Sequence, residues 1–200
     1  VINYISHKED MTELRAADER IQQLTHYDQL TQLPNREYLE QQFNHALRAA
    51  REYQESIAVL CLNLDNFRAV NDALGQGAGD EVLRMVASRL RLALAVRDVV
   101  TRQSADTFMI MLPGVGRDRA ATVASGLLNV LESPLWVHDK ELNMTASVGI
   151  SLYPGDGESL ETLLMRAEAA MFEVKASGRN SLRFFEPKMQ SQTSRVLEIS

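Results

Sequence analysis

The pattern of apolar and polar positions divides the chain into alternating helical and extended segments. Residues 57–64 form a nearly unbroken apolar run, which is typical of a central strand buried on both faces. In the segment that follows, Leu83, Val86, Leu90 and Leu94 recur at helical spacing and mark the core face of a helix. From residue 36 onwards, the predicted helices cover 36–53, 66–74, 78–95, 117–132 and 158–176.

The extended segments between these helices predict hairpins. Short apolar runs at 98–101 and 109–112 flank residues 102–108, which indicates two strands joined by a tight turn. A second hairpin is expected to turn at Asp139-Lys140 and to end in a strand at 145–152, with 181–185 as an edge strand. Helices and strands that interleave with local hairpins favour an α+β sheet covered by helices.

Composition narrows the class of protein. The chain has 200 residues, 45% of them hydrophobic, which suits one compact domain with attached segments. A net charge of −6 without a long basic run argues against a nucleic-acid-binding face. No apolar stretch approaches the roughly 20 residues of a membrane span, and the first residues lack the features of a signal peptide. We therefore expect a cytoplasmic fragment with no membrane segment of its own.

Two further features concern single residues and the N-terminal segment. Cys61, the only cysteine, lies in the apolar run and is expected to be a buried hydrophobic residue.

Leu14, Ala17, Ile21 and Leu24 have the spacing of a coiled-coil seam, but only over about two heptads. A paired helix connecting two domains is the favoured interpretation, and an amphipathic helix lying on its own domain is the alternative.

Four motifs, in order along the chain, resemble the GGDEF (diguanylate cyclase) family. The first is Asp28-x-Leu-Thr-x-Leu-Pro-Asn-Arg36, and the second is Asp65-x-Phe-Arg-x-x-Asn-Asp-x-x-Gly75 followed by Gly79-Asp80. The others are Ser147-Val-Gly-Ile-Ser151 and Lys175-Ala-Ser-Gly-Arg-Asn180. The resemblance implies a five-stranded, mostly antiparallel sheet flanked by helices, like that of class III nucleotidyl cyclases and polymerase palms.

The same resemblance implies a division of the chain. Residues 28–186 would be the GGDEF domain, and residues 1–13 resemble the end of an upstream PAS sensor domain. Residues 14–27 would be a signalling helix through which the parent protein dimerises. Residues 187–200 resemble the linker and the start of an EAL phosphodiesterase domain. The expected parent is a bacterial PAS–GGDEF–EAL protein, with the adjacent PAS and EAL domains as partners.

The family's signature loop is altered in this chain. Ser104-Ala105-Asp106-Thr107-Phe108 stands where the family carries Gly-Gly-Asp/Glu-Glu-Phe. Active members condense two GTP molecules into cyclic di-GMP across a dimer, using Mg²⁺ held by carboxylates from the central strand and this loop. Here the slot on the central strand matches Asn63, and Thr107 replaces the second acidic residue of the loop. Ser104 and Ala105 also add Cβ atoms where glycine would let the nucleotide approach.

The retained ligands indicate at most a weak metal site. Asp106 and the backbone carbonyl of Leu64 remain, so Mg²⁺ is expected only together with bound GTP. Losing two carboxylates removes charge stabilisation that is worth several kcal/mol in sites of this kind, on the order of 10²-fold or more in rate. We therefore expect no catalytic residues and an absent or vestigial cyclase activity, although the sequence alone leaves enzyme activity open.

The nucleotide-recognition residues implied by the resemblance are better preserved. Asn71 and Asp80 would read the guanine edge, because a carboxylate accepts hydrogen bonds that guanine donates and adenine cannot. Lys175 and Arg179 would contact phosphates, Phe67 marks the loop whose backbone approaches them, and Arg68 keeps a cation there. Taken singly, Asn71 could cap a turn, and the two basic residues could be a solvated helix end.

A second ligand site of the family is altered as well. Its product-inhibition motif, Arg-x-x-Asp, matches Asp98, but the arginine position holds Ala95. Binding of cyclic di-GMP at this place is therefore not expected.

These observations predict a catalytically degenerate GGDEF domain that binds GTP and regulates an adjacent EAL phosphodiesterase domain. One alternative is a ligand-free coupling or dimerisation module. A less favoured one is an active cyclase whose single metal is held by Asp106, the Leu64 carbonyl and the triphosphate.

Overall fold

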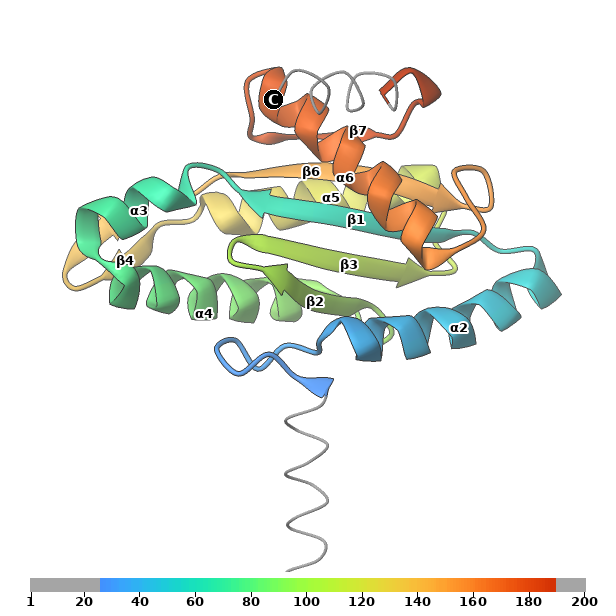
Figure 1. The fold of residues 1–200 in the computed structure, drawn as a ribbon, viewed down its shortest axis with the longest axis horizontal. Helices are drawn as coiled ribbons and strands as arrows, with labels where there is room; N and C mark the ends of the chain where they lie inside the picture. The colour runs from blue at the N-terminus through green and yellow to red at the C-terminus, as the bar shows by residue number, and fades with distance from the viewer. Residues whose placement is uncertain (1–25, 190–200) are drawn as a thin grey trace, which may run out of the picture.

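The computed structural model describes residues 26–189, which are built around one mixed β-sheet (Figure 1). Five strands lie in the order β2-β3-β1-β6-β7. All neighbouring strands are antiparallel except β6 and β7, which run parallel. The α+β class and the mostly antiparallel five-stranded sheet are thus confirmed. The strands are β1 (Ile57–Leu64), β2 (Val99–Ser104), β3 (Thr107–Pro113), β6 (Ala146–Tyr153) and β7 (Ser181–Phe184).

Helices cover both faces of the sheet (Figure 1). Their starts and ends agree with the sequence pattern to within two residues, and capping side chains mark the starts of two of them. The Asn35 side chain accepts the Tyr38 N–H at the start of one helix, and Ser159 accepts the Thr162 N–H at the start of another. The helices are α2 (Arg36–Tyr53), α3 (Phe67–Leu74), α4 (Gln76–Ala93), α5 (Arg117–Glu132), α6 (Leu160–Ala176) and the 3₁₀ turn η1 (Pro187–Met189).

The alternation of side chains along β1 divides the core in two. Ala58, Leu60, Leu62 and Leu64 pack with α4 and α5 on one face. The odd-numbered residues from Ile57 to Cys61 pack with α2 and α6 on the other face. Because side chains alternate with a period of two, Asn63 continues the second row, on the face that α6 covers. All eight residues of β1 are buried, as the unbroken apolar run predicts.

The second hairpin differs from the prediction. It consists of β4 (Leu135–Val137) and β5 (Lys140–Leu142), which form a separate two-stranded sheet and turn at His138-Asp139. The following strand, β6, belongs to the main sheet instead. It pairs with β1 along its whole length, so its apolar residues are buried in the core, which a short hairpin at the surface could not provide.

The expected PAS-like segment at 1–13, most of the signalling helix at 14–27 and most of the linker at 187–200 lie outside the described residues. Within residues 26–189, no helix has the length and apolar character that crossing a membrane requires.

Candidate functional site

The candidate site lies where the end of β1 meets the tip of the β2–β3 hairpin. Asn63 is paired across the sheet with Thr107, the first residue of β3. One residue further, the Leu64 N–H donates to the backbone oxygen of Asp106 (3.0 Å). The structure therefore brings together the four positions at which the sequence analysis placed the altered metal site.

Asn63 is the centre of a hydrogen-bond network at this point. Its side-chain Nδ2 donates to Asp106 Oδ1 (3.1 Å) and to Thr107 Oγ1 (2.8 Å). Its Oδ1 accepts a hydrogen bond from Lys175 Nζ (2.6 Å), which reaches the site from the last turn of α6. Lys175 was expected to contact phosphates, so its contact with Asn63 is a role that the sequence analysis missed.

The partners of Asn63 determine which way its amide points. A lysine ammonium can only donate and a carboxylate can only accept, so the amide oxygen must face Lys175 and the amide nitrogen must face Asp106. Both N–H groups of Asn63 are then used, and one lone pair of its oxygen is taken by a cation.

This arrangement does not fit a pair of divalent cations. Mg²⁺ requires oxygen ligands, usually carboxylates, and the Asn63 oxygen is already engaged with Lys175. Among residues 26–189, no group of three or more His, Cys, Asp or Glu side chains is placed to hold a metal ion. What remains at the tip of the hairpin is a single carboxylate, that of Asp106.

The neighbouring carboxylate, Asp65, is committed to structure. It is 3% exposed and accepts hydrogen bonds from the hydroxyls of Thr145 (2.8 Å) and Ser147 (2.7 Å). A third hydrogen bond comes from the backbone N–H of Asn180 (3.1 Å), in the loop after α6. Asp65 thus holds the loop that carries Arg179, a role that its place in the motif did not reveal.

The hairpin accommodates Ser104 and Ala105 without a left-handed backbone. Residues 104–106 are not among the non-glycine residues with positive φ, and β2 has one residue more than β3 between the pairs Arg102–Phe108 and Ser104–Thr107. A bulge of this kind bends the strand and increases its local twist. The loss of glycine is therefore compatible with an intact turn.

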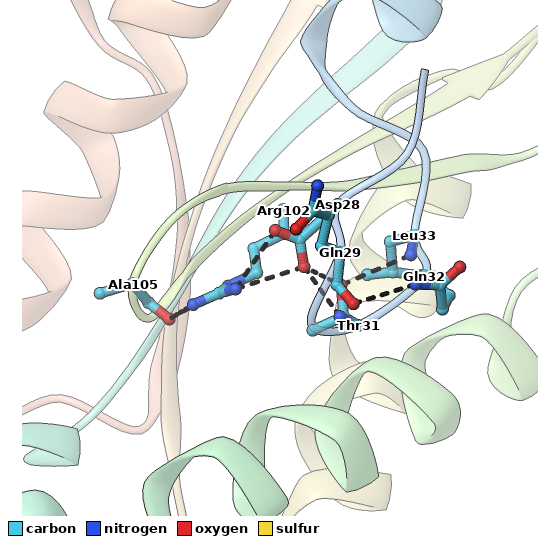
Figure 2. Close-up of polar contacts among 7 residues, drawn as sticks. All are labelled: Asp28, Gln29, Thr31, Gln32, Leu33, Arg102 and Ala105. Carbon is cyan, nitrogen blue, oxygen red and sulfur yellow. Dashed lines mark hydrogen bonds and ion pairs between the residues drawn. The ribbon is translucent and has the colours of Figure 1, made fainter. Parts of the chain in front are cut away.

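Arg102 joins this turn to the beginning of the described chain (Figure 2). Its Nε and Nη2 donate to the Ala105 carbonyl (3.3 and 3.0 Å), and its Nη1 lies 3.2 Å from Asp28 Oδ2. Asp28 in turn accepts hydrogen bonds from the N–H (2.8 Å) and the hydroxyl (2.7 Å) of Thr31. The sequence analysis did not identify Arg102, but the Asp-x-x-Thr spacing is a known sign of a turn closed by side chains.

The ionisation of Asp28 reflects these contacts. Partial burial raises its pKa, but the hydrogen bonds from Thr31 and the charge of Arg102 outweigh burial and hold the pKa below its ordinary value of 3.8. Asp28 is thus a stably charged anchor for Arg102.

The expected guanine-reading residues lie side by side on α3 and α4. Asn71 lies so close to Gly79 that a Cβ atom at position 79 would be 1.9 Å from Asn71 Oδ1 and 3.2 Å from the Phe67 ring. Asp80 follows Gly79 directly and is half-buried. The Oδ1 atom of Asn71 is buried and has no hydrogen-bond partner in the protein. A buried acceptor without a hydrogen-bond donor destabilises the protein, and a ligand that donates to it would remove this cost.

The expected phosphate-binding residues are placed less uniformly. Arg68 is exposed and lies 3.8 Å from Asp72 in an ion pair one helical turn away. Arg179 is exposed in the loop after α6, where its N–H donates to the Val174 carbonyl (3.0 Å). Lys175 is held by Asn63, so it lies nearer to the strand end than the other two basic residues.

A hollow of about 590 Å³ lies elsewhere, between α2 and the beginning of β2. Its lining includes Ala95 and Asp98, the two residues that match the family's product-inhibition motif. The Asp98 carboxylate accepts the Ala95 N–H (2.9 Å), and the Asp98 N–H donates to the Ala95 carbonyl (3.0 Å). Asp98 therefore closes its own turn, and this hollow does not adjoin the network around Asn63.

Comparison with known proteins supplies the family. A family model described as diguanylate cyclase, GGDEF domain, matches residues 25–181. Over 188 residues the chain is 37% identical to the bifunctional diguanylate cyclase/cyclic di-GMP phosphodiesterase MucR of Pseudomonas aeruginosa, covering 94% of the chain and 27% of MucR. It is 35% identical over 189 residues to the cyclic di-GMP phosphodiesterase NbdA of the same organism, covering 94% of the chain and 24% of NbdA.

The fold comparison agrees with the sequence comparison. A solved structure of the GGDEF domain of TpbB from Pseudomonas aeruginosa superposes with a TM-score of 0.80 at 34% identity. The superposition covers 86% of this chain and 99% of that structure. The chain spans about a quarter of the length of the two curated relatives named above.

Proposed function

Because this chain belongs to the GGDEF domain family, we propose that it is a member that binds GTP without condensing it and uses the bound nucleotide to regulate an adjacent EAL phosphodiesterase domain. The observation that carries the proposal is the contrast between two parts of one site. The guanine side keeps Asn71 and Asp80, with an unpartnered buried oxygen on Asn71. The metal side has become a hydrogen-bonded network centred on Asn63.

The guanine side supports nucleotide binding through its polar chemistry. An unpaired acceptor and a half-buried carboxylate, presented by adjacent helices, match the donors on the Watson–Crick edge of guanine. The absence of a side chain at Gly79 gives the Asn71 amide its space. Selectivity for guanine over adenine would come from Asp80, since adenine presents an acceptor where guanine presents a donor.

The metal side supports the absence of cyclisation. Attack of a hydroxyl on an α-phosphate requires cations that neutralise developing charge, and their place is taken by neutral groups and one lysine. Asn63 and Thr107 contribute no charge, and Asp106 is hydrogen-bonded to Asn63. We infer that the site binds a nucleotide but does not stabilise the transition state of cyclisation.

Regulation of a neighbouring domain is supported by the relatives. MucR and NbdA carry phosphodiesterase activity in their names, and this chain spans only about a quarter of the length of each. A nucleotide can change the output of such a neighbour only if it binds more tightly to one of two conformations. The Asp28–Arg102 contact is a route for this, because it joins the N-terminal turn of the domain to the tip of the hairpin.

Titration calorimetry of the 200-residue chain with GTP and with ATP tests the proposal. We expect GTP to bind and ATP to bind at least about tenfold more weakly, since hydrogen bonds to charged groups contribute roughly 1.5–3 kcal/mol. Asp80→Ala should weaken GTP binding by a similar factor. Glu158→Ala, which removes an exposed carboxylate outside the site, should leave it unchanged. No heat at millimolar GTP, with or without Mg²⁺, would refute nucleotide binding.

One observation favours a second candidate, a coupling module without a ligand. Lys175, one of the expected phosphate contacts, already has a partner in Asn63. If this is its whole role, the titration shows no binding of GTP, and Asp80→Ala leaves the output of the neighbouring domain unchanged.

A further inference from the structure

We propose that this domain binds its nucleotide without a divalent cation, because the Lys175 ammonium supplies the positive charge at the Asn63 oxygen. The inference rests on the proposed function, since it specifies how the same site would hold GTP. It departs from the chemistry expected of a nucleotidyl cyclase fold, in which metal ions bridge the protein and the phosphates.

The first support is the way in which the β1 end and the hairpin are joined. Two carboxylates that face each other repel and need a cation between them. Here the Asn63 amide donates directly to Asp106 and Thr107, so the two segments are held together by hydrogen bonds alone. Asn63 is only 7% exposed and Thr107 only 8% exposed, so these hydrogen bonds are shielded from water.

The second support is the charge balance of the network. Lys175 contributes one positive charge, Asp106 one negative charge, and Asn63 and Thr107 none. A divalent cation entering here would meet an ammonium group at the Asn63 oxygen and only one carboxylate. The nearby Asp65 is not a substitute, because both its oxygens already accept hydrogen bonds from the protein.

The third support is the position of Lys175. Helix α6 lies directly on β6, where a Cβ atom on Gly149 would be 1.9 Å from the Ala167 carbonyl oxygen. This close packing, together with the burial of Met171 and Val174, holds the last turn of α6 over the sheet. The charge of Lys175 also acts on Cys61 in β1. Burial raises the pKa of the Cys61 thiol and Glu168 raises it further, whereas Lys175 lowers it.

These features predict what a triphosphate would encounter. Its negative charge would meet the Lys175 ammonium, which the protein holds in place before the nucleotide arrives, and the exposed Arg179 guanidinium. Magnesium would add little affinity, because a cation is already present and its carboxylate ligands are missing.

The test is calorimetry of the full chain with GTP at constant ionic strength, once in EDTA and once in excess Mg²⁺. We expect the two dissociation constants to agree within about threefold, a difference smaller than removing one charge-assisted contact produces. Tightening by Mg²⁺ of about threefold or more would overturn the inference and leave the proposed function intact. No binding in either buffer would refute both the proposed function and the inference that rests on it.

Variants that remove the charge of Lys175, or that add carboxylates at positions 63 and 107, test the inference further. Lys175→Met should weaken GTP binding in EDTA by at least about tenfold, whereas Lys140→Met, at an exposed lysine on β5, should not. Asn63→Asp combined with Thr107→Glu should make binding depend on Mg²⁺ by at least about tenfold. Gln103→Glu adds one charge to the exposed part of the same hairpin and should remain insensitive to Mg²⁺. Unchanged binding by Lys175→Met in EDTA would contradict the inference even if the double variant failed to fold.

Discussion

Asparagine and aspartate have nearly the same shape, but at the end of β1 only asparagine can donate a hydrogen bond to the neighbouring carboxylate. A carboxylate can only accept hydrogen bonds, so an acid at this position would face the Asp106 carboxylate, 3.1 Å from the present amide nitrogen, without a proton between them. The amide of Asn63 donates to Asp106 and Thr107 and accepts from Lys175. Because residue 63 is asparagine, the groups around it form hydrogen bonds with one another without a metal ion.

The hydroxyl of Thr107 is part of this network, and its removal should be measurable. Thr107→Val keeps the shape but leaves one Asn63 N–H without its acceptor in a buried place, so we expect the free energy of unfolding to fall by about 1–3 kcal/mol. The measurement is urea denaturation followed by circular dichroism.

The matched control is Thr101→Val on the neighbouring strand. Its hydroxyl is fully buried but makes only a long hydrogen bond of 3.4 Å to the Met109 carbonyl. We expect a change of less than about 1 kcal/mol there. Equal losses at positions 101 and 107 would contradict the view that Asn63 depends on its threonine acceptor.

At the residue scale, the sequence predicted which positions meet but not which contacts they make. Position 63 and the hairpin tip were expected together because the family resemblance implies a metal site formed by the central strand and the signature loop. The Lys175 contact could not be predicted, because 112 residues separate it from Asn63 and only the packing of α6 brings them together. Arg102 was missed for the same reason, since its partner Asp28 is 74 residues away.

At the scale of elements, α6 lies close against β6. Small residues on β6 allow it: Gly149 lies under the helix backbone, and the Ser151 hydroxyl donates to the Leu163 carbonyl (2.7 Å). At Gly149 the helix backbone itself comes close to the strand, in addition to the side-chain packing around it. The last turn of this helix carries Lys175, whose ammonium contacts Asn63.

Gly149→Ala should disturb this contact. The new methyl group would lie 1.9 Å from the Ala167 oxygen and 2.2 Å from the Met171 nitrogen, so α6 would have to move away from the sheet. We expect a loss of about 3 kcal/mol in the free energy of unfolding, at the upper end of the usual cost of overpacking.

Gly126→Ala on α5 provides the matched control. Nothing lies within 4 Å of the added methyl group there, and alanine favours helix over glycine. We expect a gain of about 0.5–1 kcal/mol, measured by the same chemical denaturation. A comparable loss at both positions would rule out close helix–strand packing as the cause.

The elements themselves were largely predictable because their patterns are local. The run at 57–64 and the helical spacing at 83–94 correspond to β1 and α4. The partner of β6 was not predictable in the same way, because hairpin signals favour neighbours in sequence. Pairing of β6 with β1 is decided by the core that the two strands share with α4 and α5.

At the scale of the whole molecule, the turn at the start of the described chain is tied to the β2–β3 hairpin, whose tip forms part of the candidate site. Asp28 and Arg102 form the contact drawn in Figure 2. Their side chains are only 24% and 14% exposed, so the ion pair is partly shielded from solvent. The described part of the chain begins at His26, two positions before Asp28. A movement of the turn would therefore be transmitted to the loop that carries Ser104 and Ala105.

The strength of this link should appear in the dependence of stability on pH. The pKa of Asp28 is lower in the folded chain than its ordinary value of 3.8, so the unfolded chain binds the proton more tightly. The stabilisation is present above about pH 4 and is lost as the pH falls through the lowered pKa. For a partly exposed pair we expect it to be worth about 1 kcal/mol or less.

The measurement compares unfolding free energies of the wild-type chain and Asp28→Asn between about pH 6 and pH 3. Asparagine can still accept a hydrogen bond from Thr31 but cannot pair with Arg102 as an ion, so the variant should be less stable than wild type near neutral pH. The difference should shrink as the pH falls, because Asp28 loses its charge in the wild type. Glu158→Gln, at an exposed carboxylate, should follow the wild-type curve throughout. A constant difference between wild type and Asp28→Asn would show that Asp28 acts through its shape and not through its charge.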